Sequence, residues 1–361
     1  MINEIGLRNF KCFSDKKIKL NTLTILAGAN ASGKSSIIQA LLLYFHSKEN
    51  ITANIIDVNN FLHIDIGSPK ELLCQNPVGD AQTIDIIMKD AKENTETVKF
   101  KIQDPGLSLE VIDKKFNQDN HYFLQYLNAE RIGPRIMNQI LVTQNGVSAN
   151  GENAAYIIEK SDREEFMVSD FMRDKEDKSK KFSYQVEKWM SAILGELQID
   201  VQTDYQKSKT EIKYRNSYTD YEVVPPLTGF GISYVLPIVV AGLYCSGVET
   251  PSVLLVENPE AHLHPNAQSN IGKFLALIAQ SGVQVILETH SDHVIDGARL
   301  QMIKGAKTNK MVINYFENLI GEVSVHEISV KENGDLTEWP KGFFDQKQTD
   351  LRELMKVKMK L

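Results

Sequence analysis

The sequence predicts an α/β protein with a mixed sheet, an antiparallel β subdomain and a helical lobe. First, the apolar run Leu23–Ala27 ends in glycine and precedes residues at helical spacing. Second, short apolar runs at Ser252–Val256 and Val283–Leu287 flank a helical segment, Pro265–Ala279. This order predicts a βαβ unit with parallel strands. Third, β-rich runs separated by polar turns extend from about Ala81 to Asp113, as expected for an antiparallel meander.

The remaining elements follow from the same periodicities. Alternating apolar residues near the N-terminus predict two short strands, and we expect the turn between them at Ser14–Lys17. Residues 151–200 read as amphipathic helices, followed by short strands at Ile199–Thr203 and Lys209–Tyr214. A helix is expected over Tyr234–Tyr244, and residues 312–338 return to β character.

A glycine-rich segment, GANASGKS over residues 28–35, fits the P-loop pattern G-x-x-x-x-G-K-[ST] without a mismatch. It lies between a buried strand and a helix, which disfavours the alternative of a glycine turn with a chance lysine. Backbone N–H groups of such a loop wrap phosphates, and the helix N-terminus adds partial positive charge. We therefore expect Lys34 to reach the β- and γ-phosphates of ATP, and Ser35 to bind Mg²⁺. The other nucleotide-binding residues predicted here are Gly28, Asn30, Ser32, Gly33 and Ser36.

A second motif is the apolar run from Ser252 that closes with Glu257. In P-loop folds, a strand expected beside the P-loop strand ends in an acid that holds Mg²⁺ through water, and we predict that role for Glu257. The alternative is an acidic helix cap, because Pro259 and Glu260 precede a helical stretch.

Four histidines occur nearby: His262, His264, His290 and His293. Zinc is the less favoured interpretation, because no cysteine joins them. His290 follows the apolar strand that ends at residue 287, where a side chain can hydrogen-bond the γ-phosphate.

Composition restricts the class of protein. The 361 residues are 42% hydrophobic and carry a net charge of −7, so any DNA contact must come from a local patch. Arg173–Lys181 and Lys356–Lys360 are candidates, although solvated charged segments are the more favoured interpretation. The longest apolar stretch, Tyr234–Cys245, is too short to span a membrane. No secretory signal is recognised, and three scattered cysteines indicate a reducing cytoplasm.

Three segments carry a family resemblance: GANASGKSS, LLVENPEAHLHPNAQ and VILETHSDHVI. Together they resemble the ABC-like AAA ATPases of the RecF, SMC and OLD-nuclease group, and Leu7–Phe13 is similar to that group's first strand. The match is closest to compact bacterial ATPases with GFGIS before the acidic strand and GFFDQ near the C-terminus. The resemblance implies a P-loop NTPase of the ABC-ATPase type that uses ATP and Mg²⁺.

In such ATPases two subunits sandwich two ATP molecules, and a signature motif completes each site from the partner. By position, the resemblance assigns that role to Gly229, Gly231 and Ser233, and it makes His290 the switch histidine. It also places Arg131 in a loop that links two lobes, as a phosphate or coupling contact.

One departure concerns catalysis. The family's usual pair is two adjacent acids, of which the first binds Mg²⁺ and the second polarises water, whereas this chain has Glu257 and Asn258. An amide cannot take a proton at neutral pH. Either Glu260 or Glu288 substitutes, or hydrolysis is slow. The predicted catalytic residues are Glu257, Asn258, Glu260 and His290.

The resemblance divides the chain into three parts. We expect an ATPase lobe with the P-loop and meander over 1–135, a helical and β insert over 136–225, and the signature-like motif, acidic strand and switch histidine over 226–361. The expected function is a homodimeric ATP switch that controls a separately encoded effector or a DNA transaction, in DNA repair or anti-phage defence. The alternatives are an OLD-like nuclease, although no Asp-x-Asp element follows Leu300, and a structural ATP-binding scaffold without turnover.

Overall fold

The central layer is a six-stranded mixed sheet. The computed structural model describes residues 1–59, 67–103, 108–117, 119–141, 145–174, 179–216, 221–319 and 322–359, so residues 175–178 and Lys360 of the two basic candidates lie outside the described residues. The strand order is β15 (Glu322–Ser329), β14 (Met311–Leu319), β3 (Leu23–Gly28), β13 (Gln284–Glu288), β12 (Ser252–Glu257) and β8 (Phe123–Leu127). All neighbours pair in parallel except β14 and β15.

The sheet confirms the βαβ unit, in which α5 (Pro265–Gln280) joins the parallel strands β12 and β13. The expected neighbour of the P-loop strand was wrong, however, because β13 lies between β3 and β12. Both strands are almost entirely apolar and buried, so neither pattern specifies which of them pairs with β3. As a consequence Glu288, at the end of β13, is nearer to the P-loop strand than Glu257.

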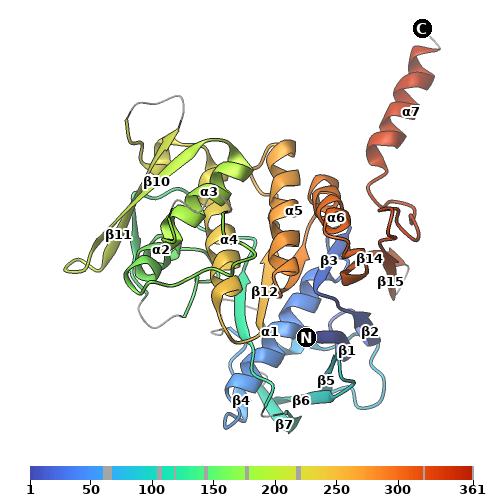
Figure 1. Cartoon of the computed structure of the whole chain (residues 1–361). Helices are drawn as coiled ribbons and strands as arrows, with labels where there is room; N and C mark the ends of the chain where they lie inside the picture. The colour runs from blue at the N-terminus through green and yellow to red at the C-terminus, as the bar shows by residue number, and fades with distance from the viewer. Residues whose placement is uncertain are drawn as a thin grey trace.

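A six-stranded antiparallel sheet lies against one side of the molecule (Figure 1). Its order is β2 (Phe13–Lys19), β1 (Ile2–Phe10), β5 (Thr83–Asp90), β6 (Thr95–Gln103), β7 (Ser108–Lys115) and β4 (Ile55–Ile56). The meander is confirmed, but the first turn was placed wrongly. It lies at Lys11 and Cys12, whereas Ser14–Lys17 belongs to β2. The pairing of Phe10 with Phe13, both buried, fixes the shorter connection.

Two hydrophobic cores flank the central sheet. The α1 helix (Lys34–Glu49) shares one core with the antiparallel sheet and one face of the central strands. The other face packs against α4 (Phe230–Gly247), α5 and α6 (Asp292–Lys304). Four layers therefore follow one another, namely the antiparallel sheet, α1, the central sheet and the helices α4, α5 and α6, so the P-loop helix lies between two sheets.

The helical lobe consists of α2 (Ala154–Arg163) and α3 (Phe182–Leu194), beside a three-stranded sheet. That sheet has the order β10 (Leu197–Asp204), β11 (Lys209–Asn216) and β9 (Met137–Gln139). Short 3₁₀ helices occur at Pro69–Leu72, Pro225–Leu227 and Thr308–Lys310. At the C-terminus, α7 (Gln346–Lys358) has no buried residue and extends away from the body (Figure 1).

The α4 helix begins four residues earlier than expected, at Phe230. Gly231 and Ser233 are therefore in its first turn, and the extended Gly229 is its N-cap. With 18 residues, the helix is long enough and, by composition, apolar enough to cross a membrane. Residues 235–243 are all buried in the core with α3 and α5, so packing within the protein accounts for the apolar composition.

Candidate functional site

The loop between β3 and α1 has the backbone shape of a phosphate-binding loop. Gly28 has φ 144° and Gly33 has φ 96°, a region that L side chains rarely occupy. A Cβ at Gly28 would lie 2.3 Å from the carbonyl oxygen of Phe316. A Cβ at Gly33 would lie 2.7 Å from Sγ of Cys12. Glycine is therefore required where the loop passes β14 and the turn between β1 and β2.

Lys34 begins α1, and only 3% of it is exposed. Its ammonium donates to the carbonyl oxygens of Gly28 (3.1 Å) and Ala29 (2.6 Å) and lies 3.9 Å from the Glu288 carboxylate. Burial lowers the pKa of Lys34, and Glu288 opposes that change. Ser32 is fully buried, and its hydroxyl oxygen has no hydrogen-bond partner. A cation beside an unpartnered hydroxyl, at a helix N-terminus, fits a phosphate group.

A cavity of about 330 Å³ opens at this loop. The predicted residues that line it are Asn30, Ser32, Gly33, Lys34, Ser35, Ser36 and His290. Lys11, Cys12, Gln39 and Glu288 also line it and were not in the predicted nucleotide-binding set. The first three surround the turn between β1 and β2, which the sequence placed elsewhere. Only the family similarity of that first strand could have indicated them.

Glu288 is the acid that contacts the P-loop. The Ser35 hydroxyl donates to its two carboxylate oxygens, at 2.9 and 3.2 Å. The glutamate is 5% exposed, and Nε2 of His290 lies 4.0 Å from its carboxylate. Burial, with a smaller contribution from the neighbouring Glu257 carboxylate, raises the pKa of Glu288 to about 6. Ser35 and Lys34 favour its charged form.

Glu257 pairs with Glu288 across the β12–β13 ladder, but its carboxylate is held from the other side. One oxygen accepts from the Tyr126 hydroxyl at 2.9 Å, and the other accepts from the Ala129 N–H at 3.3 Å. Burial raises the pKa of Glu257, and these hydrogen bonds oppose the change. Glu257 is therefore close to the P-loop acid without touching Ser35, contrary to the direct neighbourhood that the sequence predicted.

Asn258 and Glu260 have structural partners. Asn258 has φ 44°, and its N–H donates to the Glu288 carbonyl at 2.9 Å, while its side-chain oxygen is buried without a partner. The Glu260 carboxylate accepts from the Thr289 hydroxyl at 2.7 Å and from the His290 N–H at 2.6 Å. Glu260 thus fixes the loop that carries His290. Burial, followed by the Lys34 charge, lowers the pKa of His290.

Arg131 connects these elements. It is 2% exposed, and its guanidinium donates to the carbonyl oxygens of Asn128 (2.9 Å), Glu257 (2.6 Å) and Asn258 (2.6 Å). Burial lowers its pKa to about 10, which leaves it charged at neutral pH. It also lies 5.4 Å from the ring centre of Tyr234, in the first turns of α4. The buried arginine therefore links the acidic strand end to the signature-like helix.

The signature-like residues lie outside the cavity. Gly229 is exposed, with no atom within 4 Å of an added Cβ. A Cβ at Gly231 would lie 3.1 Å from the His262 carbonyl oxygen, and Ser233 lines a separate cavity of about 30 Å³. His264 caps α5, so the histidines have separate surroundings. Within the described ranges, no three His, Cys, Asp or Glu side chains could hold a metal together.

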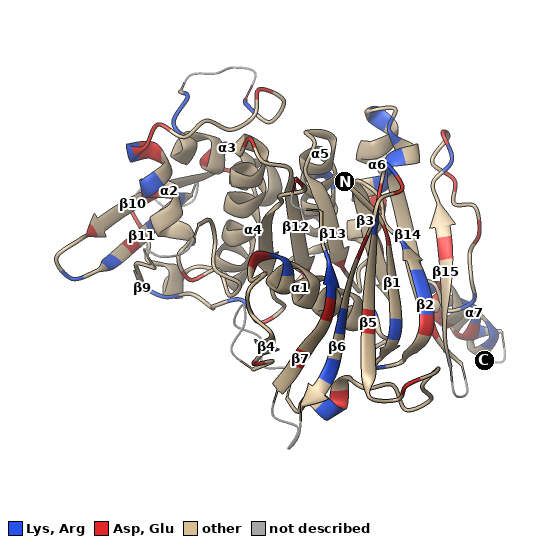
Figure 2. Cartoon of the chain, turned by 90° about the horizontal axis from the view of Figure 1, so that it is seen from below, with Lys and Arg blue, Asp and Glu red and all other residues tan. Residues whose placement is uncertain are grey.

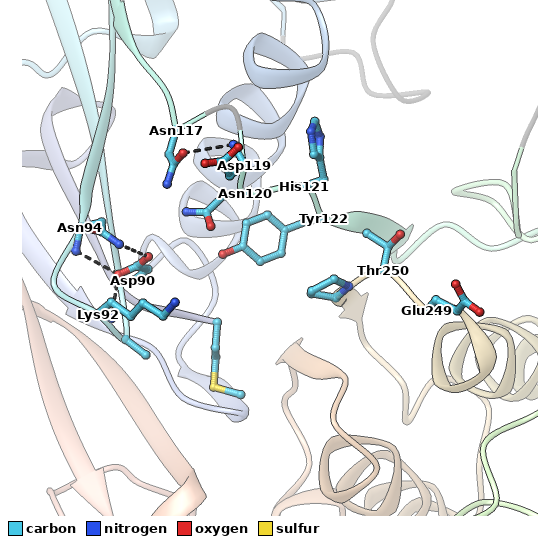
Figure 3. A pocket seen from close by; sticks show the side chains of 13 residues that line it. Asp90, Lys92, Asn94, Asn117, Asp119, Asn120, His121, Tyr122, Glu249 and Thr250 are labelled. Carbon is cyan, nitrogen blue, oxygen red and sulfur yellow. Dashed lines mark hydrogen bonds between the residues drawn. The ribbon is translucent and has the colours of Figure 1, made fainter.

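Another cavity, of about 700 Å³, contains none of the predicted residues. It lies near the N-terminus, between the β5–β6 turn and the start of β12 (Figure 3). Its Asp90 carboxylate accepts from the N–H groups of Lys92 and Asn94 and is satisfied within its own turn. The residues that line this cavity include no glycine-rich loop of the P-loop kind.

Charge is mixed along the antiparallel sheet. Figure 2 shows basic and acidic residues interspersed on its strands. Arg8 pairs with Asp15, and Lys99 with Asp85. The strands therefore present no continuous basic stripe of the kind that dominates phosphate-backbone recognition.

Two family models match the sequence. The model of the AAA ATPase domain matches residues 1–295, and that of a protein of unknown function (DUF3696) matches residues 307–354.

Three curated proteins are similar. The uncharacterized protein MJECL10 of Methanocaldococcus jannaschii is 26% identical over 163 residues, which cover 42% of this chain and 70% of that protein. The OLD nuclease of Thermus scotoductus is 20% identical over 349 residues, which cover 87% of this chain and 64% of the nuclease. The DNA double-strand break repair Rad50 ATPase of Archaeoglobus fulgidus is 38% identical over 53 residues, which cover 14% of this chain and 6% of that protein.

Solved structures share the fold. An SMC head bound to the C-winged helix domain of ScpA aligns with a TM-score of 0.57 and 14% identity, covering 92% of this chain and 99% of the other. An Smc head with an extended coiled coil, bound to the C-terminal domain of ScpA derived from Pyrococcus furiosus, aligns with a TM-score of 0.53 and 13% identity, covering 98% and 99%. At this identity the likeness shows the fold, which is that of an ABC-type P-loop ATPase.

Proposed function

The chain belongs to the AAA ATPase domain family, within the ABC-like group of RecF, SMC and OLD proteins, and from this premise we propose that it is an ATP-gated dimeric switch. The observation that carries the proposal is the cavity at the P-loop. It brings Lys34, the unpartnered Ser32 hydroxyl, Ser35 and an acid together at a helix N-terminus. Those groups match a nucleoside triphosphate better than an uncharged ligand.

We assign the binding roles as follows. Lys34 turns from the loop carbonyls to the β- and γ-phosphates, and Ser32 donates its free hydroxyl to a phosphate oxygen. Ser35, with Glu257 acting through water, would hold Mg²⁺, and the ion would supply positive charge against the phosphates. His290 reaches the γ-phosphate from a loop that Glu260 fixes. In the nucleotide complex the Ser35 hydroxyl exchanges its contact with Glu288 for the metal.

The proposed turnover is slow. The side-chain amide of Asn258 cannot accept a proton from water, so the position that usually supplies the general base supplies none here, and turnover depends on an acid from elsewhere in the site. A proton acceptor is typically worth about 10²–10⁴-fold in rate. A long-lived ATP state suits a switch, because the signalling form persists until it is triggered.

The proposed dimer face is the start of α4. Leu227 is 78% exposed and Phe230 is 53% exposed, on either side of the N-cap Gly229. The exposed helix N-terminus, free of acidic residues in its first turn, can contribute N–H groups to a partner's γ-phosphate. Gly229 is the clean position for a test, because a large side chain there meets no atom of its own chain. Gly231 is not, because it is already crowded by the His262 carbonyl.

The proposed partner is a separately encoded effector, and DNA is a second candidate, in a cytoplasmic DNA-repair or anti-phage role. The exposed apolar side chains of α7, including Leu354 (56%) and Met355 (63%), support protein binding. Similarity to Rad50 and to SMC heads bound to ScpA supports both partners. An OLD-like nuclease is the alternative, favoured by the similarity that extends over 87% of the chain.

Calorimetry of Mg²⁺-ATP binding tests the nucleotide assignment. Lys34→Ala removes the buried cation of the loop and should abolish measurable binding, whereas Lys347→Ala, on the exposed α7, should bind as the wild type does. Equal affinity of Lys34→Ala and the wild type would refute the assignment.

A further inference from the structure

The nucleotide cavity needs a proton acceptor, and the positions expected to supply one do not. Hydrolysis requires a group that orients water and takes its proton. Asn258 is an amide. Both oxygens of Glu260 are occupied by Thr289 and His290, and Glu260 does not line the cavity. Both oxygens of Glu257 accept hydrogen bonds on the β8 side of the strand, and Glu257 does not line the cavity either.

Glu288 is the carboxylate that remains. It is the only acid lining the P-loop cavity in the part of the chain that the structure describes. Its oxygens lie 2.9 and 3.2 Å from the Ser35 hydroxyl and 3.9 Å from the Lys34 ammonium, on the strand next to β3. The backbone contact from the Asn258 N–H to the Glu288 carbonyl places the two positions side by side.

We propose that Glu288 is the catalytic carboxylate of the ATPase, moved by one strand from the position that Asn258 occupies. The inference rests on the proposed function. The water oxygen forms a bond to the γ-phosphorus, and the bond from that phosphorus to the bridging oxygen of ADP breaks. One water proton passes to a carboxylate oxygen of Glu288, and from there to inorganic phosphate or solvent.

The local packing suits this role. The Lys34 ammonium lies 3.9 Å from the Glu288 carboxylate and the Ser35 hydroxyl donates to it, so a cation and a hydrogen-bond donor both face this group. The contact with Ser35 leaves lone pairs on both carboxylate oxygens, and Glu288 lines the P-loop cavity, whereas Glu257 and Glu260 do not. If the Ser35 hydroxyl turned to a bound Mg²⁺, the Glu288 carboxylate would stay on the buried strand β13 and would lose this donor, so a water could donate to it instead.

Glu288→Gln tests the proposal, because the amide keeps the size of the side chain and an acceptor for the Ser35 hydroxyl. The full chain is assayed for phosphate release in the steady state and, separately, for Mg²⁺-ATP affinity by calorimetry. We expect the rate of phosphate release to fall by about 10²–10⁴-fold. The affinity for Mg²⁺-ATP should stay within about threefold of the wild-type value, because the substitution leaves the phosphate contacts in place. The acid-to-amide control Glu327→Gln, on the exposed face of β15, should leave both quantities unchanged.

Other results decide against the proposal. The catalytic role of Glu288 would be overturned if Glu288→Gln hydrolysed ATP at the wild-type rate. It would also be overturned if this variant lost affinity for ATP but hydrolysed the ATP that it does bind at the wild-type rate. Wild-type protein that binds no ATP would instead overturn the proposed function, and that is read from the calorimetry alone. A matching thermal midpoint for the two amide variants shows that the fold is retained.

Discussion

Arg131→Ala should destabilise the protein strongly and disorganise the acidic strand end. The arginine is buried, and its guanidinium is the hydrogen-bond donor to the Asn128, Glu257 and Asn258 carbonyl oxygens. Alanine leaves these carbonyls facing a space that the side chain filled, and it also removes the contact with Tyr234.

The magnitude follows from the contacts. A hydrogen bond from a charged donor is worth about 1.5–3 kcal/mol, so three bonds at 2.6–2.9 Å set an upper range of about 4.5–9 kcal/mol. Water that enters the space, and the regained cost of burying a charge, reduce the net loss to about 3–5 kcal/mol. That is a large fraction of the roughly 5–15 kcal/mol by which a typical domain is stable.

Urea denaturation followed by tryptophan fluorescence measures this loss. We expect a lower urea midpoint for Arg131→Ala with an unchanged dependence of the unfolding free energy on urea concentration. Phosphate release should also be slower, because Arg131 no longer holds the Glu257 backbone in place. Arg163→Ala is the control, because that arginine forms an exposed pair with Glu159 and should leave the midpoint unchanged. Equal midpoints for Arg131→Ala and the wild type would refute the buried-link argument.

Three further outcomes are expected. Gly28→Ala should lower the free energy of urea unfolding by about 2–6 kcal/mol, of which about 1–3 kcal/mol comes from backbone strain and about 1–3 kcal/mol from overlap with β14. Gly79→Ala, where an added Cβ meets nothing within 4 Å, should lower it by only about 1–2 kcal/mol. Equal losses for the two variants would contradict this prediction. Asn258→Glu should restore part of the phosphate release that Glu288→Gln loses, and no recovery would show that position 258 cannot present a carboxylate to water. The chain alone should leave plasmid intact with Mg²⁺ or Mn²⁺, and cleavage that disappears in chain variants would favour the nuclease alternative.

Local patterns predicted much of the fold. The strand, glycine loop and helix around Lys34 form a contiguous signal, and the structure has β3 and α1 there. The meander and the βαβ unit were predicted because their residues alternate or run apolar over short stretches. The predicted P-loop residues other than Gly28 line one cavity, because a single loop carries them.

What the sequence did not predict depends on contacts between distant segments. The position of β13 between β3 and β12 follows from packing of two equally apolar strands, and it is what brings Glu288 to Ser35. The occupation of Glu260 by the loop at 289–290, and the three carbonyls that Arg131 binds, also join segments far apart in the chain. Periodicity carries no information on such pairs.

The central claim is that ATP closes the chain into a dimer, and the mass in solution tests it most directly. Sedimentation velocity is measured with Mg²⁺ and a non-hydrolysable ATP analogue, and without nucleotide, for the wild type and Gly229→Trp. The account predicts that the analogue moves the wild type from the 40.7 kDa of one chain to twice that mass, or compacts a dimer already present. Gly229→Trp should bind the analogue with unchanged affinity and remain open. An identical sedimentation profile of the wild type with and without a bound analogue would contradict the switch.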